Sequence, residues 1–506
     1  MRAQKFTEEI SNAYQFEGES FPLGCGILDG KPLGECRVNI PLATLNRHGL
    51  VAGATGTGKT KTIQVLAEGL SDHQVPVLLM DLKGDLSGLA ASGSSHPKIE
   101  ERQEYIGIPF VPKSFPVELM SLSNDYGIPL RATITEFGPI LLSKVLDLNE
   151  TQSAVLAVLF QYLDDEAIPL VDLKDLKKAL RFIIEEGKQE FESNYGRVSS
   201  ASVGAIQRKI IALEQQGAEQ FFGEPSFEID DLMRLDQNQQ AFISIMRLTD
   251  IQDRPALFSS FMLSLLVELY ESLPEQGDAD RPKLVIFIDE AHLLFREASD
   301  ALVDQLEIIV KLIRSKGVGL FFCTQAPDDI PNPILGQLGL RVQHALRAVT
   351  AKDRKAIRLV AENFPLSDFY KTEEALTSLG IGEALFTCLN EKGIPTPLVA
   401  TYLLAPRSRM GVLSDPELAK QLSRSELMPK YQKAIDRDSA FEMLNRRMVE
   451  EEDVLKPNSP KAQRKPASDF LLESLSKNTF VRQMGRTVIR ELSRGLMGVL
   501  GLKGRR

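Results

Sequence analysis

Residues 53–60 combine glycines with a lysine and a threonine in a spacing that suits phosphate binding. They read Gly53-Ala54-Thr55-Gly56-Thr57-Gly58-Lys59-Thr60, which fits the pattern GxxxxGK[ST]. Glycines let backbone N–H groups wrap around phosphate oxygens, and a helix that starts at the loop adds a favourable dipole. In this chemistry Lys59 reaches the β- and γ-phosphates and the Thr60 hydroxyl binds Mg²⁺. The alternative is a glycine-rich turn at a helix start, but the complete motif favours a nucleotide site.

Two adjacent carboxylates, Asp289 and Glu290, follow the apolar run 284–288. A buried strand would deliver both to its carboxyl end, where ligands bind in open α/β sheets. We expect Asp289 to hold Mg²⁺, directly or through water, and Glu290 to polarise the attacking water as a general base. Acids are also favoured at helix N-termini. Together with the phosphate-binding loop, the pair favours catalysis.

Two further polar residues end apolar runs. Gln325 follows the run 319–323, and an amide there could donate to a γ-phosphate or orient water. An ordinary strand end capped by a hydroxyl is the alternative, and the residue alone does not decide between the two. Asp81 ends the run 75–81 and could lie beside the nucleotide, but acids also start loops and cap helices. The residues alone leave both readings of Asp81 open.

Two arginines have positions that suit phosphoryl transfer. Arg47 precedes the glycine-rich loop, and Arg314 precedes the strand that ends near Gln325. A γ-phosphate transition state is stabilised by an arginine supplied in cis or by a neighbouring subunit. Most arginines in a chain of this length are solvated surface residues, so spacing alone assigns neither.

The elements that must position these groups alternate between strands and helices, which predicts a mainly parallel, doubly wound sheet. Residues 1–44, rich in glycine and proline, read as short strands and turns. From about 138 to 220, apolar residues recur at helical spacing, which predicts an all-helical insertion. The strands are expected at 49–52, 75–81, 241–246, 284–288 and 319–323, and a helix at 60–70.

Composition bounds the class of protein. The 506 residues suffice for two to four domains and are 43% hydrophobic and 25% charged, as in a globular protein with a large core. No apolar stretch reaches the ~20 residues of a membrane span, and the N-terminus lacks the apolar core of a secretory signal. Four cysteines without CxxC spacing and five scattered histidines argue against zinc or disulfides. We therefore expect a cytoplasmic protein.

The charge is unevenly distributed. The overall net charge is −10, yet residues 477–506 carry eight Lys or Arg and one acid. On a helix, the arginines of this tail would form a stripe beside an apolar face. Such a helix could dock on the protein's own ring or a neighbouring subunit, which we favour, or bind DNA or an anionic membrane.

The ordered set GATGTGKT, MDLKGD, IDEAH and RSKGVGLFFCTQ resembles the HerA–FtsK superfamily of hexameric DNA-pumping ATPases, and is most similar to the bacterial HerA-like group that includes the YjgR proteins. The resemblance covers residues 40–405. It implies a RecA-like core and functional roles for the residues named above, with Arg47 and Arg314 acting between subunits. Asp85 stands where the family usually has Glu. Archaeal members dock a nuclease with a larger N-terminal barrel, and we expect residues 1–44 to be too short for all of it.

These observations predict a Mg²⁺-dependent ATPase that binds ATP, forms a homo-oligomeric ring, expected to be a hexamer, and acts on DNA. An ATP-driven remodeller of protein complexes and a nucleotide-gated scaffold with little turnover are the alternatives. Binding alone requires neither Glu290 nor Gln325, which weighs against the scaffold. The segments expected are a β-type N-terminal part (1–44), the ATPase core (45–137 and 223–405), the helical insertion (138–222), a helical C-terminal region (406–455), a linker (456–469) and the basic amphipathic tail (470–506).

Overall fold

The computed structural model describes residues 1–122, 127–249, 255–277, 279–296 and 300–454. Its strands join into a single sheet over these residues. The strands are β1 (Ser20–Leu28), β2 (Lys31–Pro41), β3 (Gly49–Ala52), β4 (Val77–Asp81), β5 (Val117–Ser121), β6 (Ile128–Pro129), β7 (Ile243–Arg247), β8 (Leu284–Ile288), β9 (Val318–Thr324), β10 (Leu340–His344), β11 (Glu383–Thr387) and β12 (Val399–Leu403). Their order in the sheet is β2-β1-β12-β11-β10-β3-β9-β8-β4-β7-β5-β6.

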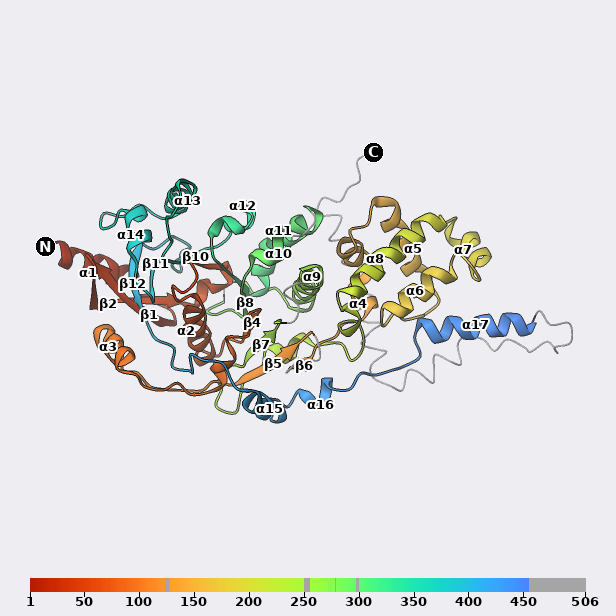
Figure 1. Cartoon of the computed structure of the whole chain (residues 1–506), viewed down its shortest axis with the longest axis horizontal. Coiled ribbons are helices and arrows are strands. Elements are labelled where there is room, and N and C mark those ends of the chain that lie inside the picture. The colour runs from red at the N-terminus through yellow and green to blue at the C-terminus, as the bar shows by residue number, and fades with distance from the viewer. Residues whose placement is uncertain (123–126, 250–254, 278, 297–299, 455–506) are drawn as a thin grey trace. The chain divides into compact units, whose positions relative to one another are not determined.

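Helices connect most of the strands, and further helices follow the last strand, β12, in the sequence (Figure 1). Residues Met1–Leu444 form one compact unit, and a second begins at Asn445. The α-helices are α1 (Arg2–Ala13), α2 (Lys59–Asp72), α3 (Pro97–Ile106), α4 (Ile134–Val145), α5 (Glu150–Asp165), α6 (Leu173–Phe182), α7 (Lys188–Tyr195), α8 (Ser200–Gln215), α9 (Pro255–Ser272), α10 (His292–Arg296), α11 (Asp300–Ile313), α12 (Asn332–Leu335), α13 (Ala351–Glu362), α14 (Thr372–Ser378), α15 (Asp415–Ser423), α16 (Met428–Tyr431) and α17 (Ala440–Val454).

The part of the sheet from β10 to β6 is parallel throughout, which confirms the predicted α/β class. Strand β8 coincides with the predicted run 284–288, and all five of its side chains are buried. It packs against β9 through Phe287 and Phe321, whose ring centroids lie 4.9 Å apart. Full burial of each such side chain contributes on the order of 1.5–3 kcal/mol. The central strands are therefore well packed and can hold the residues at their carboxyl ends in fixed positions.

The register of these central strands aligns their carboxyl ends. Ala52 at the end of β3 lies opposite Thr324 at the end of β9. Ile288 of β8 lies opposite both Phe322 of β9 and Met80 of β4. Because each motif begins one residue after these positions, the glycine-rich loop and the polar residues that follow β4, β8 and β9 leave the same edge of the sheet.

The N-terminal segment contains a helix that the sequence analysis did not predict. Helix α1 occupies residues 2–13 and buries Phe6 and Ile10, one helical turn apart. The β-type character expected for this segment is confirmed by β1 and β2, which pair antiparallel, and β1 continues the main sheet by pairing with β12. The segment is therefore an antiparallel extension of the core sheet, reached through β11 and β12.

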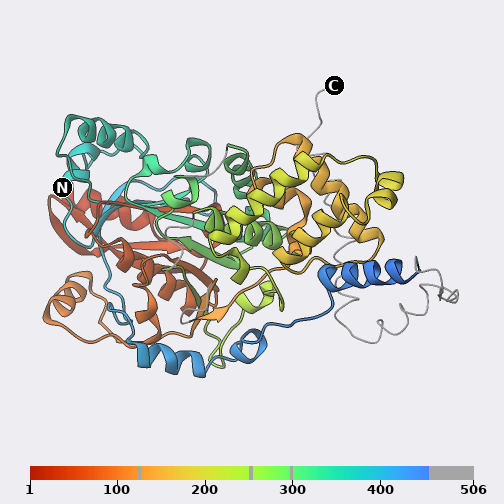
Figure 2. The same cartoon turned by 45° about the vertical axis from the view of Figure 1, so that its right-hand side comes forward.

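The helical insertion is confirmed as helices α4 to α8, and Figure 2 shows α5 to α8 packed side by side. Helix α4 contacts both α5 and α9, which joins this group to the rest of the unit. Three of the helices start with capping boxes, in which side chain and backbone satisfy each other's free hydrogen-bonding groups. The paired residues are Thr133 with Glu136, Asn149 with Gln152, and Asp172 with Asp175. The segment boundaries expected from the sequence stay predictions.

Among the described residues, no helix is long and apolar enough to cross a membrane. The predicted basic tail at 470–506 lies outside the described residues, as does the linker at 456–469.

Candidate nucleotide site

The glycine-rich loop connects β3 to α2 in the strand–loop–helix order that the motif requires. Gly53 and Gly58 have φ of 151° and 117°, which side-chain-bearing residues rarely adopt. A Cβ on Gly53 would lie 2.4 Å from the Cβ of His344, so any larger residue would displace the loop. Helix α2 begins at Lys59. The free backbone N–H groups of its first turn therefore point toward the loop.

Lys59 lies across the loop. Its Nζ donates hydrogen bonds to the carbonyl oxygens of Gly53, at 2.6 Å, and Ala54, at 3.3 Å. Burial lowers the pKa of Lys59, the positive charge of Lys83 lowers it further, and the carboxylates of Glu290 and Asp289 oppose the shift. The ammonium is therefore held at the loop and lies within the field of both predicted catalytic acids.

Asp81 has a structural task in the turn after β4. Its carboxylate is fully buried and accepts hydrogen bonds from the backbone N–H groups of Gly84, Asp85 and Leu86 at 2.7, 3.2 and 3.1 Å. Burial is the main cause that raises its pKa to about 6. These contacts favour the alternative in which Asp81 shapes the loop. The turn after β4 brings two other charged residues, Asp85 and Lys83, to the site.

The first of these residues is Asp85, which was not among the predicted site residues. Its Oδ2 accepts a hydrogen bond from the Thr60 hydroxyl at 3.3 Å. Its Oδ1 is buried and has no hydrogen-bond partner among the described residues. A hydroxyl, this carboxylate and the nearby Asp289 form an oxygen-rich set of the kind that Mg²⁺ prefers, so the residues present fit that ion.

No group of three or more His, Cys, Asp or Glu that could hold a metal by itself occurs in the described part of the chain. A Mg²⁺ site does not require such a group, because Mg²⁺ is usually held by one or two carboxylates together with phosphates and water. The four cysteines are buried and free in the structure.

Asp289 and Glu290 lie side by side in different environments. Asp289 is buried, which raises its pKa to about 7, and Lys83 opposes that rise. Burial also pushes the pKa of Glu290 upward, but hydrogen bonding and charge from Lys83, with help from His292, bring it below its usual value. Glu290 has φ of 46°, an unusual conformation for a glutamate. Strain of this kind is concentrated at functional sites.

The Glu290 carboxylate has partners on both oxygens. Oε1 is paired with the Lys83 ammonium. Oε2 lies 3.2 Å from Nδ1 of His292 and accepts from Nε2 of Gln325 at 3.5 Å. The structure thus brings Gln325 to Glu290, as the alignment of β8 and β9 predicts. Lys83 was missed by sequence reasoning, although its position two residues after Asp81 could have suggested it.

Arg47 and Arg314 lie near one another, but not at the glycine-rich loop. Both line a pocket of about 490 Å³ that also includes Lys311 and Arg341. Arg47 ends the 3₁₀ turn Leu42–Arg47 before β3, and Arg314 begins the 3₁₀ turn Arg314–Lys316 before β9. Because the loop follows the carboxyl end of β3, the arginines lie at the amino ends of the same parallel strands. The two arginines therefore lie at the opposite end of the strands from Lys59.

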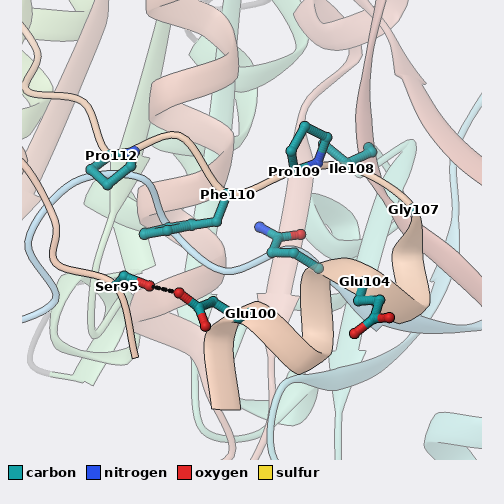
Figure 3. A pocket seen from close by; sticks show the side chains of 9 residues that line it. Ser95, Glu100, Glu104, Gly107, Ile108, Pro109, Phe110 and Pro112 are labelled. Carbon is teal, nitrogen blue, oxygen red and sulfur yellow. Dashed lines mark hydrogen bonds between the residues drawn. The ribbon is translucent and has the colours of Figure 1, made fainter. Parts of the chain in front are cut away.

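A second pocket, of about 550 Å³, lies beside α3 and contains none of the predicted site residues. In Figure 3, Phe110, Pro109 and Pro112 form one side, and Glu100 and Glu104 of α3 the other. Ser95 donates a hydrogen bond to Glu100 there.

The phosphate-binding loop between β3 and α2, the parallel sheet and the two acids that follow β8 define a P-loop NTPase with a RecA-like core. The family model described as "Helicase HerA-like C-terminal" matches residues 28–471. The chain belongs to this family, and the resemblance to the HerA–FtsK superfamily is confirmed.

Two curated relatives are named "DNA double-strand break repair helicase HerA". The protein from Sulfurisphaera tokodaii is 23% identical over 70% of this chain and 65% of its own length. The protein from Saccharolobus solfataricus is 23% identical over 84% of this chain and 76% of its own length. This chain therefore spans just under two thirds of the first relative.

Solved structures of the bacterial conjugative coupling protein TrwB share the fold. An unbound form, TrwBdeltaN70, has a TM-score of 0.52 and 15% identity, covering 81% of this chain and 94% of that chain. TrwB in complex with the non-hydrolysable ATP analogue ADPNP has a TM-score of 0.50 and 16% identity, covering 79% of this chain and all of that chain. These similarities support the RecA-like P-loop fold.

Proposed function

We propose that this chain is a Mg²⁺-dependent ATPase that assembles into a ring, expected to be a hexamer, and translocates on or unwinds duplex DNA. The observation that supports the ATPase most directly is the convergence of Lys59, Thr60, Asp289 and Glu290 at one edge of the sheet. The names of the HerA relatives support DNA as the substrate.

The chain's own residues divide the work of hydrolysis. The backbone N–H groups of residues 53–60 and the Lys59 ammonium hold the β- and γ-phosphates. Thr60, Asp289 and Asp85 supply oxygens toward Mg²⁺, which neutralises charge on the phosphates when bound. Glu290 takes the proton of the attacking water, and Gln325, which already contacts Glu290, orients that water.

The arginines are assigned to a neighbouring subunit. Arg47 and Arg314 lie at the amino ends of β3 and β9, so they face away from the loop of their own chain. In a ring, the pocket of one copy can face the carboxyl edge of the next, where an arginine stabilises charge on the γ-phosphate. The separation of the two edges is the reason for proposing a ring.

The test is the ATPase rate with and without duplex DNA, measured beside particle mass by light scattering and symmetry by negative-stain microscopy. We expect DNA to raise the rate and ATP to favour closed rings. ATP turnover that ignores DNA but responds to a protein substrate would favour the remodeller, and tight ATP binding without turnover would favour the scaffold. A monomer in the presence of ATP would contradict the intersubunit role of the arginines.

A further inference from the structure

Lys83 is a charged residue at the site to which the proposed mechanism gives no task. It lies in the turn that Asp81 shapes after β4. Its ammonium forms an ion pair with Oε1 of Glu290, whose side chain is only 8% exposed, while the Lys83 side chain is 43% exposed. Lys83 thus extends from the surface to the buried carboxylate that would act as the general base.

The ion pair with Lys83 means that both carboxylate oxygens of Glu290 have neighbouring polar groups. With Oε2 beside Gln325 and His292, the ion pair with Lys83 leaves neither carboxylate oxygen without a partner. A carboxylate whose negative charge is paired with an ammonium is a weaker acceptor for the proton of a water molecule. The pair therefore holds the base in an arrangement unsuited to proton transfer.

We propose that Lys83 restrains Glu290 and that the ion pair opens when nucleotide phosphates occupy the loop. The inference rests on the proposed function, because it takes Glu290 as the base. Phosphates carry more negative charge than one carboxylate, and they would lie at Lys59, which interacts electrostatically with Lys83. Occupancy of the loop therefore weakens the hold of Glu290 on Lys83. Since Lys83 is partly exposed, it can swing away without disturbing the core.

The pair can be captured directly by a water-soluble carbodiimide. The reagent activates the Glu290 carboxyl group, the Lys83 amine attacks it, and an amide forms while the reagent leaves as a urea. Mass spectrometry of peptides then measures the Lys83–Glu290 link. The matched control is the pair of Lys113 with Asp72, whose atoms lie 2.6 Å apart on an unrelated surface.

We expect the Lys83–Glu290 link in nucleotide-free protein and at least a threefold loss of it with Mg²⁺ and ATPγS, while the Lys113–Asp72 link is unchanged. A link that persists although ATPγS is bound would overturn the inference and leave the proposed function intact. Absence of the link in nucleotide-free protein, with the control link present, would also overturn it. Failure of ATPγS to bind would instead contradict the proposed function and remove the trigger.

Kinetics of Lys83 variants give an independent readout. An ion pair with one exposed partner restrains by a factor of about five at most. We therefore expect Lys83→Met to raise kcat without DNA about threefold to fivefold, with KM for ATP within about twofold of wild type. Lys83→Arg, which keeps the charge, should lie between wild type and Lys83→Met, and Lys113→Met should leave kcat unchanged. A lower kcat in Lys83→Met would overturn the inference, because it would show that Lys83 assists the reaction.

Discussion

Replacing Glu290 by glutamine separates chemistry from binding at this site. The amide keeps the size of the side chain but cannot accept a proton, so turnover should fall by about 10²–10⁴-fold, which corresponds to about 3–5 kcal/mol in the barrier. Binding should survive, because the groups that hold phosphates are the loop N–H groups and Lys59, which hydrogen-bonds to Gly53 and Ala54. Loss of the ion pair with Lys83 leaves a positive charge available to the phosphates, so ATP should bind equally well or up to about fivefold more tightly.

Single-turnover hydrolysis of labelled ATP measures the first effect, and filter binding of the same nucleotide measures the second. The matched control is Glu185→Gln, which removes an exposed carboxylate on the surface of the helical insertion and should change neither quantity. A Glu290→Gln variant that hydrolyses ATP within tenfold of the wild-type rate would refute the assignment of the general base. A variant that loses both binding and hydrolysis would show that Glu290 acts through the structure of the site.

Three other predictions concern the loop, the ring and the core. Lys59→Ala should abolish ATP binding in the filter assay, because it removes the ammonium that lies across the loop; retained affinity would contradict its role. Arg314→Ala should bind ATP without hydrolysing it. If the arginine acts across subunits, mixing this variant with Lys59→Ala subunits should restore activity, whereas Arg181→Ala serves as a surface control. No recovery of activity at any mixing ratio would contradict the intersubunit model. Glu68→Ala should lower the free energy of unfolding in urea by about 2–4 kcal/mol, because buried Glu68 accepts hydrogen bonds from the backbone and side chains of Arg407 and Ser408. A loss below about 0.5 kcal/mol would show that these hydrogen bonds do not stabilise the fold.

The sequence could predict the central strands that are continuously apolar. The run at 284–288 is continuously apolar, and the structure forms β8 over the same residues. Strands β10 and β11 were missed because each mixes apolar with polar residues, as in LRVQH and EALFT. Helix α1 offered only Phe6 and Ile10 as buried apolar positions, too few for periodicity to reveal it. Long-range pairing in the sheet supplies what local pattern lacks.

The candidate site divides in the same way. The loop at 53–60 and the acids at 289 and 290 were predictable, because each motif has a fixed local spacing and follows a strand. The ion pair between Lys83 and Glu290 could not be predicted, since it joins residues far apart in the sequence through the neighbouring strands β4 and β8. The common pocket of Arg47 and Arg314 likewise depends on which strands are neighbours. Spacing identifies reactive groups, and topology decides which of them meet.

Burial of Asp289 makes Mg²⁺-dependent binding sensitive to pH. Its pKa is raised to about 7, mainly by burial, so a falling pH protonates it in the nucleotide-free protein before most other carboxyl groups. Only the carboxylate can hold Mg²⁺, so affinity for Mg²⁺–nucleotide should be fully developed above pH 7 and weaken by up to about tenfold for each unit below it. Fluorescence titrations with an ATP analogue between pH 6 and 8 would measure this, and Asp289→Asn controls for protons taken up by the nucleotide itself. Equal slopes for wild type and Asp289→Asn would show that another group sets the pH dependence.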